Sequence, residues 1–318
     1  MNGRGAGFKR WMGHLLCLSL AVVVLSGCAE SGSTAGEGAS GPEQLRVTAT
    51  IGMIADAARE IGGDAAKVTG LMGPGVDPHL YKASQGDIRK LEEADIILYG
   101  GLHLEGKMTD ILEKMGEGRT VKAVTDDIPE ERLRKSGDGV YDPHVWFDVG
   151  LWMIAAETIR DTLIEYDPSR KAEYEERAES YLKQLEELDR YAAEQIASIP
   201  EAGRVLVTAH DAFGYFGAAY GIEVVGLQGI STASEYGAKD VADLRDMLVQ
   251  RQIKAVFVES SVPKKSIEAV LEGARRQGHE VRIGGELFSD AMGSEGTEEG
   301  TYIGMVRHNV DTIVQALR

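Results

Sequence analysis

Short β-branched segments alternate with helical patterns from residue 45 onward, and this alternation restricts the fold more than any other feature of the chain. Such alternation is typical of parallel sheets covered by helices. Four candidate strands precede a long helical gap and four follow it, which predicts two α/β lobes, each with a four-stranded parallel sheet and surrounding helices. The predicted strands are residues 45–51, 67–72, 95–99, 120–124, 204–209, 222–225, 254–259 and 280–283.

A helical pattern of about thirty residues separates the two sets of strands. Asp167 and Pro168 supply a cap and a first-turn proline, and Pro200 closes the segment. Between these ends, apolar residues recur at spacings of three and four, and a helix of this length extends roughly 45 Å. We therefore predict one long rigid helix over residues 167–200 that joins the lobes 43–166 and 201–318. A coiled-coil arm is disfavoured because it needs a cleaner and longer heptad.

The N-terminal residues have the composition of an export signal followed by a tether. Three basic residues precede an apolar stretch that is too short for a membrane span, which is typical of a secretory signal. The sequence Leu-Ser-Gly-Cys that ends at Cys28 resembles the bacterial lipobox, in which the cysteine becomes the lipidated first residue. We predict a lipoprotein signal peptide over residues 1–27 and a flexible Gly/Ser-rich tether over residues 28–42. The alternative is an ordinary signal peptide that happens to contain a cysteine.

Composition and charge exclude several classes of protein. Hydrophobic residues make up 43% and charged residues 27%, which is ordinary for a globular chain and rules out collagen-like and largely disordered classes. The net charge of −17 disfavours nucleic acid as a partner, because phosphate binding requires clustered Lys and Arg. Cleavage before Cys28 would remove Cys17, so the mature chain would have no internal disulfide and would depend on its core for stability.

Three histidines occupy similar places next to turn residues. His79 and His144 each end an Asp-Pro-His tripeptide, and His210 follows the predicted strand 204–209. Ligand sites of parallel α/β proteins gather at the carboxyl ends of strands. The proline stiffens the backbone, and the aspartate is placed to accept a proton from the second imidazole nitrogen, as metal-bound histidine usually requires. One such histidine alone would be more typical of a structural residue, but three together predict a metal site.

A set of three histidines needs a fourth ligand. Asp290, at a turn after the last predicted strand, is the strongest carboxylate candidate. Glu286 and Glu295 are the runners-up, and spacing alone does not choose among the three. His103 also follows a predicted strand, which favours a supporting role behind the ligands over direct ligation. The remaining histidines of the mature chain are expected at the surface: His279 and His308.

Motifs of common enzymes are absent from the sequence. It has no His-Glu-x-x-His, no paired cysteines and no Gly-x-Ser-x-Gly. The Gly-rich run 293–300 lacks the lysine of a phosphate loop, and its glutamates would repel phosphate, so we interpret it as a mobile loop near the site. A secreted metal-dependent hydrolase is the competing hypothesis. It requires an open coordination position and a free carboxylate base, for which Asp211 or Glu286 can be nominated without support from any motif.

Four segments resemble the metal-binding solute-binding proteins of ABC transporters, in particular the TroA-like manganese/zinc receptors. The segments are Asp77–His79, Asp142–Asp148, Thr208–Phe216 and Gly284–Gly293, and the resemblance extends from about residue 45 to the end. It implies two four-stranded α/β lobes joined by one long rigid helix, with a metal in the cleft between them. The ligands of the family fall on His79, His144, His210 and Asp290.

The same resemblance implies a function outside the cytoplasmic membrane. We expect a lipid-anchored, monomeric receptor on the cell surface or in the periplasm that captures Mn²⁺ or Zn²⁺, with Fe²⁺ as a further candidate. It would deliver the metal to a membrane permease driven by a cytoplasmic ATPase and would not be an enzyme. A role as a surface adhesin leaves no mark in the sequence.

Two departures from the family pattern affect the expected metal in opposite directions. Manganese-type relatives often carry Glu at the position of His210. Many zinc-type relatives carry a long His-rich loop before the second histidine, whereas residues 128–141 contain no histidine. Nitrogen-rich sites favour Zn²⁺ over Fe²⁺ and Mn²⁺. We therefore expect zinc to bind more tightly and manganese to be the transported metal.

Overall fold

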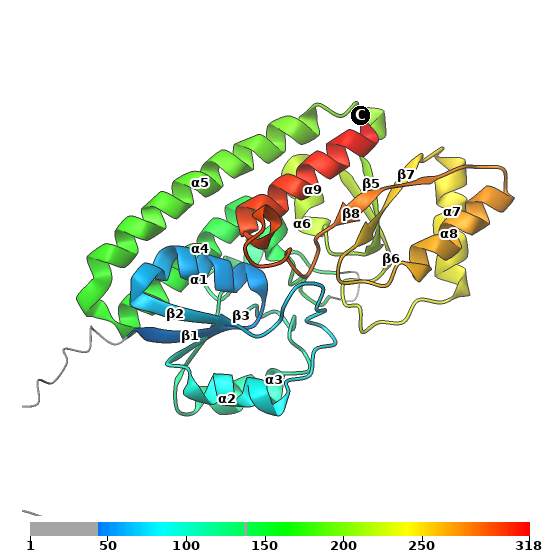
Figure 1. Cartoon of the computed structure of the whole chain (residues 1–318). Coiled ribbons are helices and arrows are strands. Elements are labelled where there is room, and N and C mark those ends of the chain that lie inside the picture. Colours follow the sequence, from blue (N-terminus) through cyan, green and yellow to red (C-terminus); the bar gives the residue numbers. More distant parts are fainter. Residues whose placement is uncertain (1–43, 137–138) are drawn as a thin grey trace, which may run out of the picture. The chain divides into compact units, whose positions relative to one another are not determined.

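The part of the chain that the structure describes contains eight short parallel strands, and His210 is the one predicted site residue that lies on a strand (Figure 1). The structure is a computed structural model that describes residues 44–136 and 139–318. The predicted signal peptide, Cys28 and the tether lie outside the described residues. The strands are β1 (Leu45–Ala49), β2 (Ala66–Gly70), β3 (Ile96–Tyr99), β4 (Thr120–Ala123), β5 (Val205–His210), β6 (Glu223–Gln228), β7 (Ala255–Glu259) and β8 (Arg282–Leu287).

The first four strands form one parallel sheet in the order β2-β1-β3-β4, as predicted. Val47 of the central strand β1 pairs with Val68 on one side and with Ile96 on the other. Helix α1 lies on the face of this sheet toward α5, and α2 and α3 lie on the other side (Figure 1). The helices are α1 (Gly52–Gly62), α2 (Gln85–Glu93), α3 (Thr109–Gly116), α4 (Val149–Tyr166), α5 (Lys171–Ala197), α6 (Gly214–Tyr220), α7 (Ala238–Gln250), α8 (Lys265–Arg276) and α9 (Tyr302–Leu317).

The last four strands depart from the predicted single sheet. They form two two-stranded parallel sheets, β5-β6 and β7-β8, and β5 lies beside β7 without a backbone ladder between them. At the ends of these two strands, the backbone N–H of His210 donates to the side chain of Glu259 at 2.9 Å. A charged side chain thus takes the place of a strand–strand hydrogen bond. The prediction of four strands in this half is confirmed, but that of one continuous sheet is wrong.

Strand β8 begins and ends later than the predicted strand 280–283. The two glycines in its centre favour a turn when the sequence is considered alone. In the structure they allow close packing: a Cβ atom at Gly285 would lie 2.3 Å from Cγ2 of Thr312 in α9, and one at Gly284 would lie 2.8 Å from Phe257 in β7. These glycines therefore permit the approach of other elements to the strand and do not end it.

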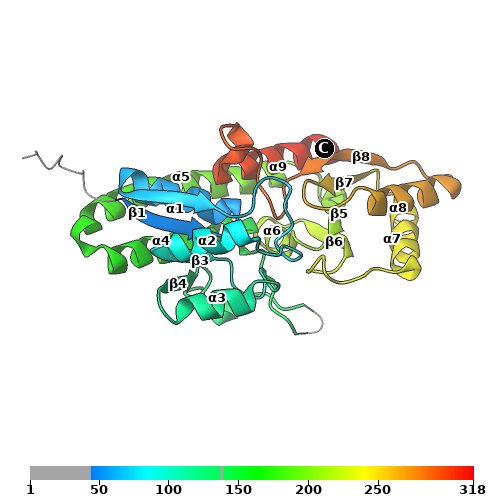
Figure 2. The same cartoon turned by 60° about the horizontal axis from the view of Figure 1, so that its bottom comes forward.

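The predicted long helix is present as α5, preceded by a 3-10 turn at Pro168–Arg170. The apolar face predicted from the sequence is buried against α1, α4 and α9, so α5 is not a projecting coiled-coil arm. Both views show α9 alongside α5 (Figure 1 and Figure 2). The buried residues of α5 are Tyr174, Ala178, Tyr181, Leu185, Leu188, Ala192 and Ile196. Within residues 44–136 and 139–318, no helix combines the length and the hydrophobicity that crossing a membrane requires.

The C-terminal helix α9 returns to the first half of the chain. Its first residue, Tyr302, donates its backbone N–H to the Asp56 carboxylate in α1 at 2.8 Å. An acidic side chain at this position also interacts favourably with the positive end of the helix dipole. The Tyr302 hydroxyl donates to the backbone carbonyl of Trp146 at 2.7 Å, two residues after His144. Helix α9 therefore connects the core of the first half to the segment that carries His144.

Candidate metal centre

The four side chains predicted as ligands come together in the structure. His79 lies in the irregular segment after β2, His144 directly precedes a 3-10 turn at Val145–Phe147, His210 is the last residue of β5, and Asp290 follows β8. One potential ligand atom from each lies within 4.8 Å of the others, and all four residues are buried. This is the only group of three or more His, Cys, Asp or Glu with such geometry within the described residues.

The carboxylate of Asp290 lies at the centre of this group. Its Oδ1 is 3.4 Å from Nε2 of His144, and its Oδ2 is 3.3 Å from Nε2 of His210. The Nε2 of His79 lies 3.9 Å from Asp290 Oδ2 and 3.3 Å from Nε2 of His144. All three imidazoles therefore direct the same ring nitrogen toward one carboxylate.

Asp142 orients the His144 ring as the sequence predicts. The Nδ1 of His144 lies 2.8 Å from Asp142 Oδ1, which also accepts the backbone N–H of His144 at 3.0 Å. The ring packs edge-on against Trp146, whose indole N–H donates to the backbone carbonyl of Ser289 at 3.1 Å. His144 is therefore fixed both to its own tripeptide and to the residue that precedes Asp290. The sequence predicts that His144 lies close to the end of a strand, as His210 does. In the structure a long loop separates His144 from the end of β4 at Ala123.

The first Asp-Pro-His tripeptide behaves differently, and the expected contact between Asp77 and the second ring nitrogen of His79 is wrong. Asp77 Oδ1 accepts the backbone N–H of His79 at 2.9 Å. Its Oδ2 accepts the hydroxyl of Thr232 at 2.6 Å, from the loop after β6. The carboxylate is turned toward the second half of the chain, so among the described residues no hydrogen bond holds Nδ1 of His79.

Glu259 is the functional residue that the sequence analysis missed. It ends β7, is buried, and places Oε2 at 2.5 Å from Nδ1 of His210. The same carboxylate accepts the backbone N–H of His210. A signal was present in the sequence, because Glu259 is the one charged residue in the otherwise apolar run Ala255–Glu259. Its partner could not be identified without knowing that β5 and β7 are adjacent.

Burial and nearby carboxylates shift the pKa values of the three imidazoles in different directions. Burial lowers the pKa of His79 to about 4, although Asp290 partly opposes this shift. For His144 burial also favours the neutral form, but the Asp142 and Asp290 carboxylates outweigh it and raise the pKa to about 9. The Glu259 and Asp290 carboxylates likewise overcome burial and hold the pKa of His210 well above its usual range. Although burial opposes the shift, the positive charges of His210 and His144 hold the pKa of Asp290 well below its usual range.

The other candidates from the sequence lie outside the centre. Glu286 is half exposed in β8 and pairs with Lys264 at 2.7 Å. Glu295 is exposed, 3.7 Å from Arg59. His103 is exposed and adopts a positive φ of 67°. The two histidines expected at the surface contact backbone carbonyls through Nε2: His279 contacts Ile253 at 2.7 Å, and His308 contacts Glu286 at 3.0 Å.

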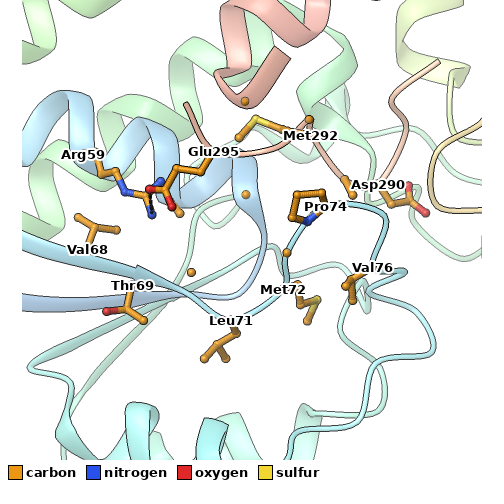
Figure 3. Close-up of a pocket in the computed structure, with 17 residues that line it drawn as sticks. Arg59, Val68, Thr69, Leu71, Met72, Pro74, Val76, Asp290, Met292 and Glu295 are labelled. Atoms are coloured by element: carbon orange, nitrogen blue, oxygen red, sulfur yellow. Dashed lines mark ion pairs between the residues drawn. The ribbon is translucent and has the colours of Figure 1, made fainter. Parts of the chain in front are cut away.

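A cavity of about 420 Å³ adjoins the centre (Figure 3). Met72, Pro74 and Val76, on the segment that leads to His79, form one wall. The loop from Asp290 to Met292 forms another, and part of the Gly-rich run 293–300 also lines the cavity. In Figure 3 the Asp290 carboxylate points away from the other lining residues. The cavity therefore lies behind two of the segments that carry site residues and is separate from the cluster of ligand atoms.

Comparison with known proteins identifies the family. The model of the family described as zinc-uptake complex component A, periplasmic (ZnuA), matches residues 47–316. The chain belongs to this family. Its members are solute-binding proteins of ABC transporters, so the chain is not an enzyme.

Two relatives of this family are similar over most of their length. The chain is 54% identical over 307 residues to the manganese-binding lipoprotein MntA of Bacillus subtilis (strain 168), which covers 96% of this chain and 99% of the relative. It is 51% identical over 271 residues to the zinc-binding protein TroA of Treponema pallidum (strain Nichols), which covers 85% of this chain and 88% of the relative.

Solved structures share the α/β fold of this chain. The structure of the periplasmic zinc-binding protein TroA from Treponema pallidum superimposes with a TM-score of 0.85 and 50% sequence identity, over 86% of this chain and 99% of that chain. A Mn-bound mutant of the periplasmic metal-binding protein from Candidatus Liberibacter asiaticus superimposes with a TM-score of 0.76 and 25% identity, over 86% of this chain and 100% of that chain.

The raised pKa of His144 predicts how the stability of the metal-free protein depends on pH. Because the folded pKa of about 9 exceeds the ordinary value of 6.5, protonation stabilises the fold fully below pH 6.5, and this contribution is lost as pH rises through 9. We expect the loss of this contribution from His144 to lower the free energy of unfolding of chelator-treated protein by about 2–3 kcal/mol between these pH values. Thermal unfolding at a series of pH values measures this change.

Asp142→Asn should reduce the same pH dependence by about half, because it removes one of the two carboxylates that raise the pKa of His144 while keeping an oxygen near its Nδ1. Asp126→Asn, at an exposed ion pair with Lys122, is the matched control and should leave the dependence as in the wild type. An Asp142→Asn profile that superimposes on that of the wild type would contradict this account of the site.

Proposed function

We propose that the protein is the lipid-anchored, extracytoplasmic solute-binding protein of an ABC importer. One divalent transition metal binds through His79, His144, His210 and Asp290 and is delivered to a membrane permease driven by a cytoplasmic ATPase. One observation carries this proposal. Both carboxylate oxygens of Asp290, and Nε2 of His210, are buried and have no hydrogen-bond partner among the described residues.

Buried polar atoms without hydrogen bonds are costly, and an ionised carboxylate in a protein interior requires a cation or donors. Three imidazole nitrogens around one carboxylate form a donor set that suits zinc and other first-row divalent metals. The atoms already face one another across 3.3–3.9 Å, so a cation between them would satisfy the buried lone pairs. The residues present therefore fit a metal as cargo.

The chain's relatives support both metals. The relative from Bacillus subtilis is named for manganese and the one from Treponema pallidum for zinc. Three nitrogen ligands favour Zn²⁺ over Fe²⁺ and Mn²⁺ in direct competition. If Asp290 binds through both oxygens, coordination rises to five, which suits manganese better than a closed tetrahedral site. We propose that zinc binds more tightly and that manganese is the transported metal.

The proposal includes an export signal, a lipid anchor and two lobes. Residues 1–27 are the signal peptide, Cys28 is lipidated, and residues 28–42 tether the folded part to the membrane. Residues 43–166 and 201–318 form the two lobes on either side of the linking segment 167–200. The similarity to a named lipoprotein over 96% of this chain supports the anchor. The protein acts as a monomer, and its acidic charge gives no support to binding of nucleic acid.

A secreted hydrolase is not favoured. A catalytic metal needs an open coordination position, whereas four protein ligands converge on this centre. Of the two nominated bases, Glu286 is paired with Lys264 at the surface. Assays of generic ester and peptide substrates with metal present should give no turnover.

Metal binding through the four residues predicts a thermal shift. A ligand that binds only the folded state stabilises it by mass action, by about 2.7 kcal/mol at one hundred times Kd. We expect zinc or manganese to raise the Tm of the wild type by about 5 °C or more. Alanine at His79, His144, His210 or Asp290 should remove most of this shift.

His103→Ala is the matched control, because His103 is an exposed histidine outside the centre, and it should keep the full shift. Calorimetric titration should give one metal per chain. The assignment fails if wild-type protein shows no shift with either metal, or if all four alanine variants retain it.

Lipidation of Cys28 predicts membrane association of the mature protein. Wild-type protein expressed in its host should fractionate with membranes and carry the mass of a diacylglyceryl group. Cys28→Ala should release the protein or leave an unprocessed precursor, because the acceptor thiol is lost. Membrane retention of Cys28→Ala equal to that of the wild type would count against the anchor.

The proposed metal preference is tested by competition and by growth. His210→Glu should shift the competition between zinc and manganese toward manganese, because it replaces a nitrogen ligand by oxygen. In a deletion strain, manganese should restore growth under metal limitation. Restoration by zinc alone would overturn the assignment of manganese as cargo and leave metal binding itself intact.

A further inference from the structure

Three of the four site residues are held by buried contacts on the side away from the metal centre. The rings of His144 and His210 each have Nδ1 against a carboxylate, that of Asp142 and Glu259 respectively. Asp290 follows Ser289, whose carbonyl accepts the Trp146 indole N–H and whose hydroxyl bonds to that of Ser261 at 2.9 Å. Moving any of these three residues would break contacts inside the core.

His79 is held differently. It lies in a segment without regular secondary structure, and its ring has no carboxylate at Nδ1 among the described residues. Its restraint is the backbone N–H bond to Asp77. His79 is 4% exposed, whereas His144 and His210 are 0% exposed. It is therefore the site residue with the fewest restraints on the side away from the centre.

A single hydrogen bond connects Asp77 to the second half of the chain. Thr232 donates its hydroxyl to Asp77 Oδ2 at 2.6 Å, in a partly buried position. Thr232 is itself restrained, because its backbone carbonyl accepts the side-chain amide of Gln228 at 2.6 Å, and Gln228 is the last residue of β6. A chain of contacts thus runs from β6 through Thr232 and Asp77 to the backbone of His79.

The segment before His79 has room to move. The cavity of Figure 3 is lined on one side by Met72, Pro74 and Val76, so tight packing does not fix this segment on that face. His210 and His144 are more tightly enclosed, since both are fully buried and so are Ala209, which precedes His210, and Pro143 and Val145, which flank His144. Asp211, which follows His210, is partly exposed. The loop from Asp290 to Met292 also lines this cavity, but Asp290 is held through the contacts of Ser289 with Trp146 and Ser261. Displacement of the His79 segment is accordingly the least costly way to break the coordination shell.

We propose that the Asp77–Thr232 hydrogen bond is a latch that holds His79 in its ligating position and sets the rate of metal release. Thr232 is a positioning residue that acts through Asp77 and never contacts the metal. This inference rests on the proposed metal-binding function. Breaking the latch frees the His79 segment to move, and the metal then leaves through loss of this ligand first.

The test compares three variants in the full mature chain loaded with Zn²⁺ or Mn²⁺. Thr232→Val keeps the shape of the side chain and removes the donor, so metal release to an excess of chelator in stopped flow should become about tenfold faster. Thr232→Ser restores the hydroxyl and should return release to within about twofold of the wild type. Ser231→Ala, which removes a hydroxyl whose one hydrogen bond within the described residues is from the nearby backbone N–H of Ala233, is the matched control and should behave as the wild type.

The readouts separate a latch from a merely structural role. Thr232→Val should still bind one metal per chain, with an association rate constant no lower than that of the wild type and a metal-free Tm lowered by no more than about 5 °C. Release from Thr232→Val at the wild-type rate would overturn the proposal, as would equally fast release from Thr232→Ser. If wild-type protein binds neither metal, the proposed function fails before the variants are compared, so the two failures are distinguishable.

Discussion

A buried carboxylate determines how the centre of this protein is built. Asp290 is enclosed by three imidazoles, and its oxygens meet no hydrogen-bond donor of good geometry among the described residues. A negative charge in the interior is tolerated only when positive charge compensates it. The His144 and His210 imidazoles supply that charge, and Asp142 and Glu259 in turn stabilise the positive forms of these two rings from behind. The negative charge of Asp290 is thus surrounded by imidazoles, and two of these imidazoles are backed in turn by carboxylates.

Such an arrangement requires the two halves of the chain to be fixed relative to each other, because His79 and His144 come from one and His210 and Asp290 from the other. Several buried contacts provide this. Tyr215 of α6 donates its hydroxyl to the backbone carbonyl of Asp142 at 3.0 Å, and the Trp146 indole bonds to the backbone that precedes Asp290. Helix α5 packs against α1 and α4 as well as α9, so it supports elements from both halves. The relative positions of the four site residues therefore depend on packing contacts far from the metal centre.

The sequence predicts what depends on periodicity and local chemistry. Local patterns predicted the eight strands, the buried face of α5 and the three histidines that the structure brings together, because these leave signals within a few residues of each other. Spacing left Asp290, Glu286 and Glu295 open, and the family resemblance favoured Asp290. The sequence alone does not predict contacts between segments that are distant along the chain. Glu259 supports His210 only because β5 and β7 are adjacent, and the glycines of β8 leave room for Thr312 of α9 and Phe257 of β7, which lie far away in the sequence. The two identical tripeptides show the same limit, since Asp77 turns toward Thr232 and Asp142 toward its own histidine.

Charge in the metal-free centre has a consequence for exchange. Neighbouring carboxylates raise the pKa values of His144 and His210 and so favour the protonated forms of these two rings, whereas burial lowers the pKa of His79 and favours its neutral form. An imidazole nitrogen that ligates a metal must give up its proton, so metal binding and protonation compete at His144 and His210. When the metal leaves, the return of protons to these rings would compensate the buried Asp290 carboxylate, which favours metal release.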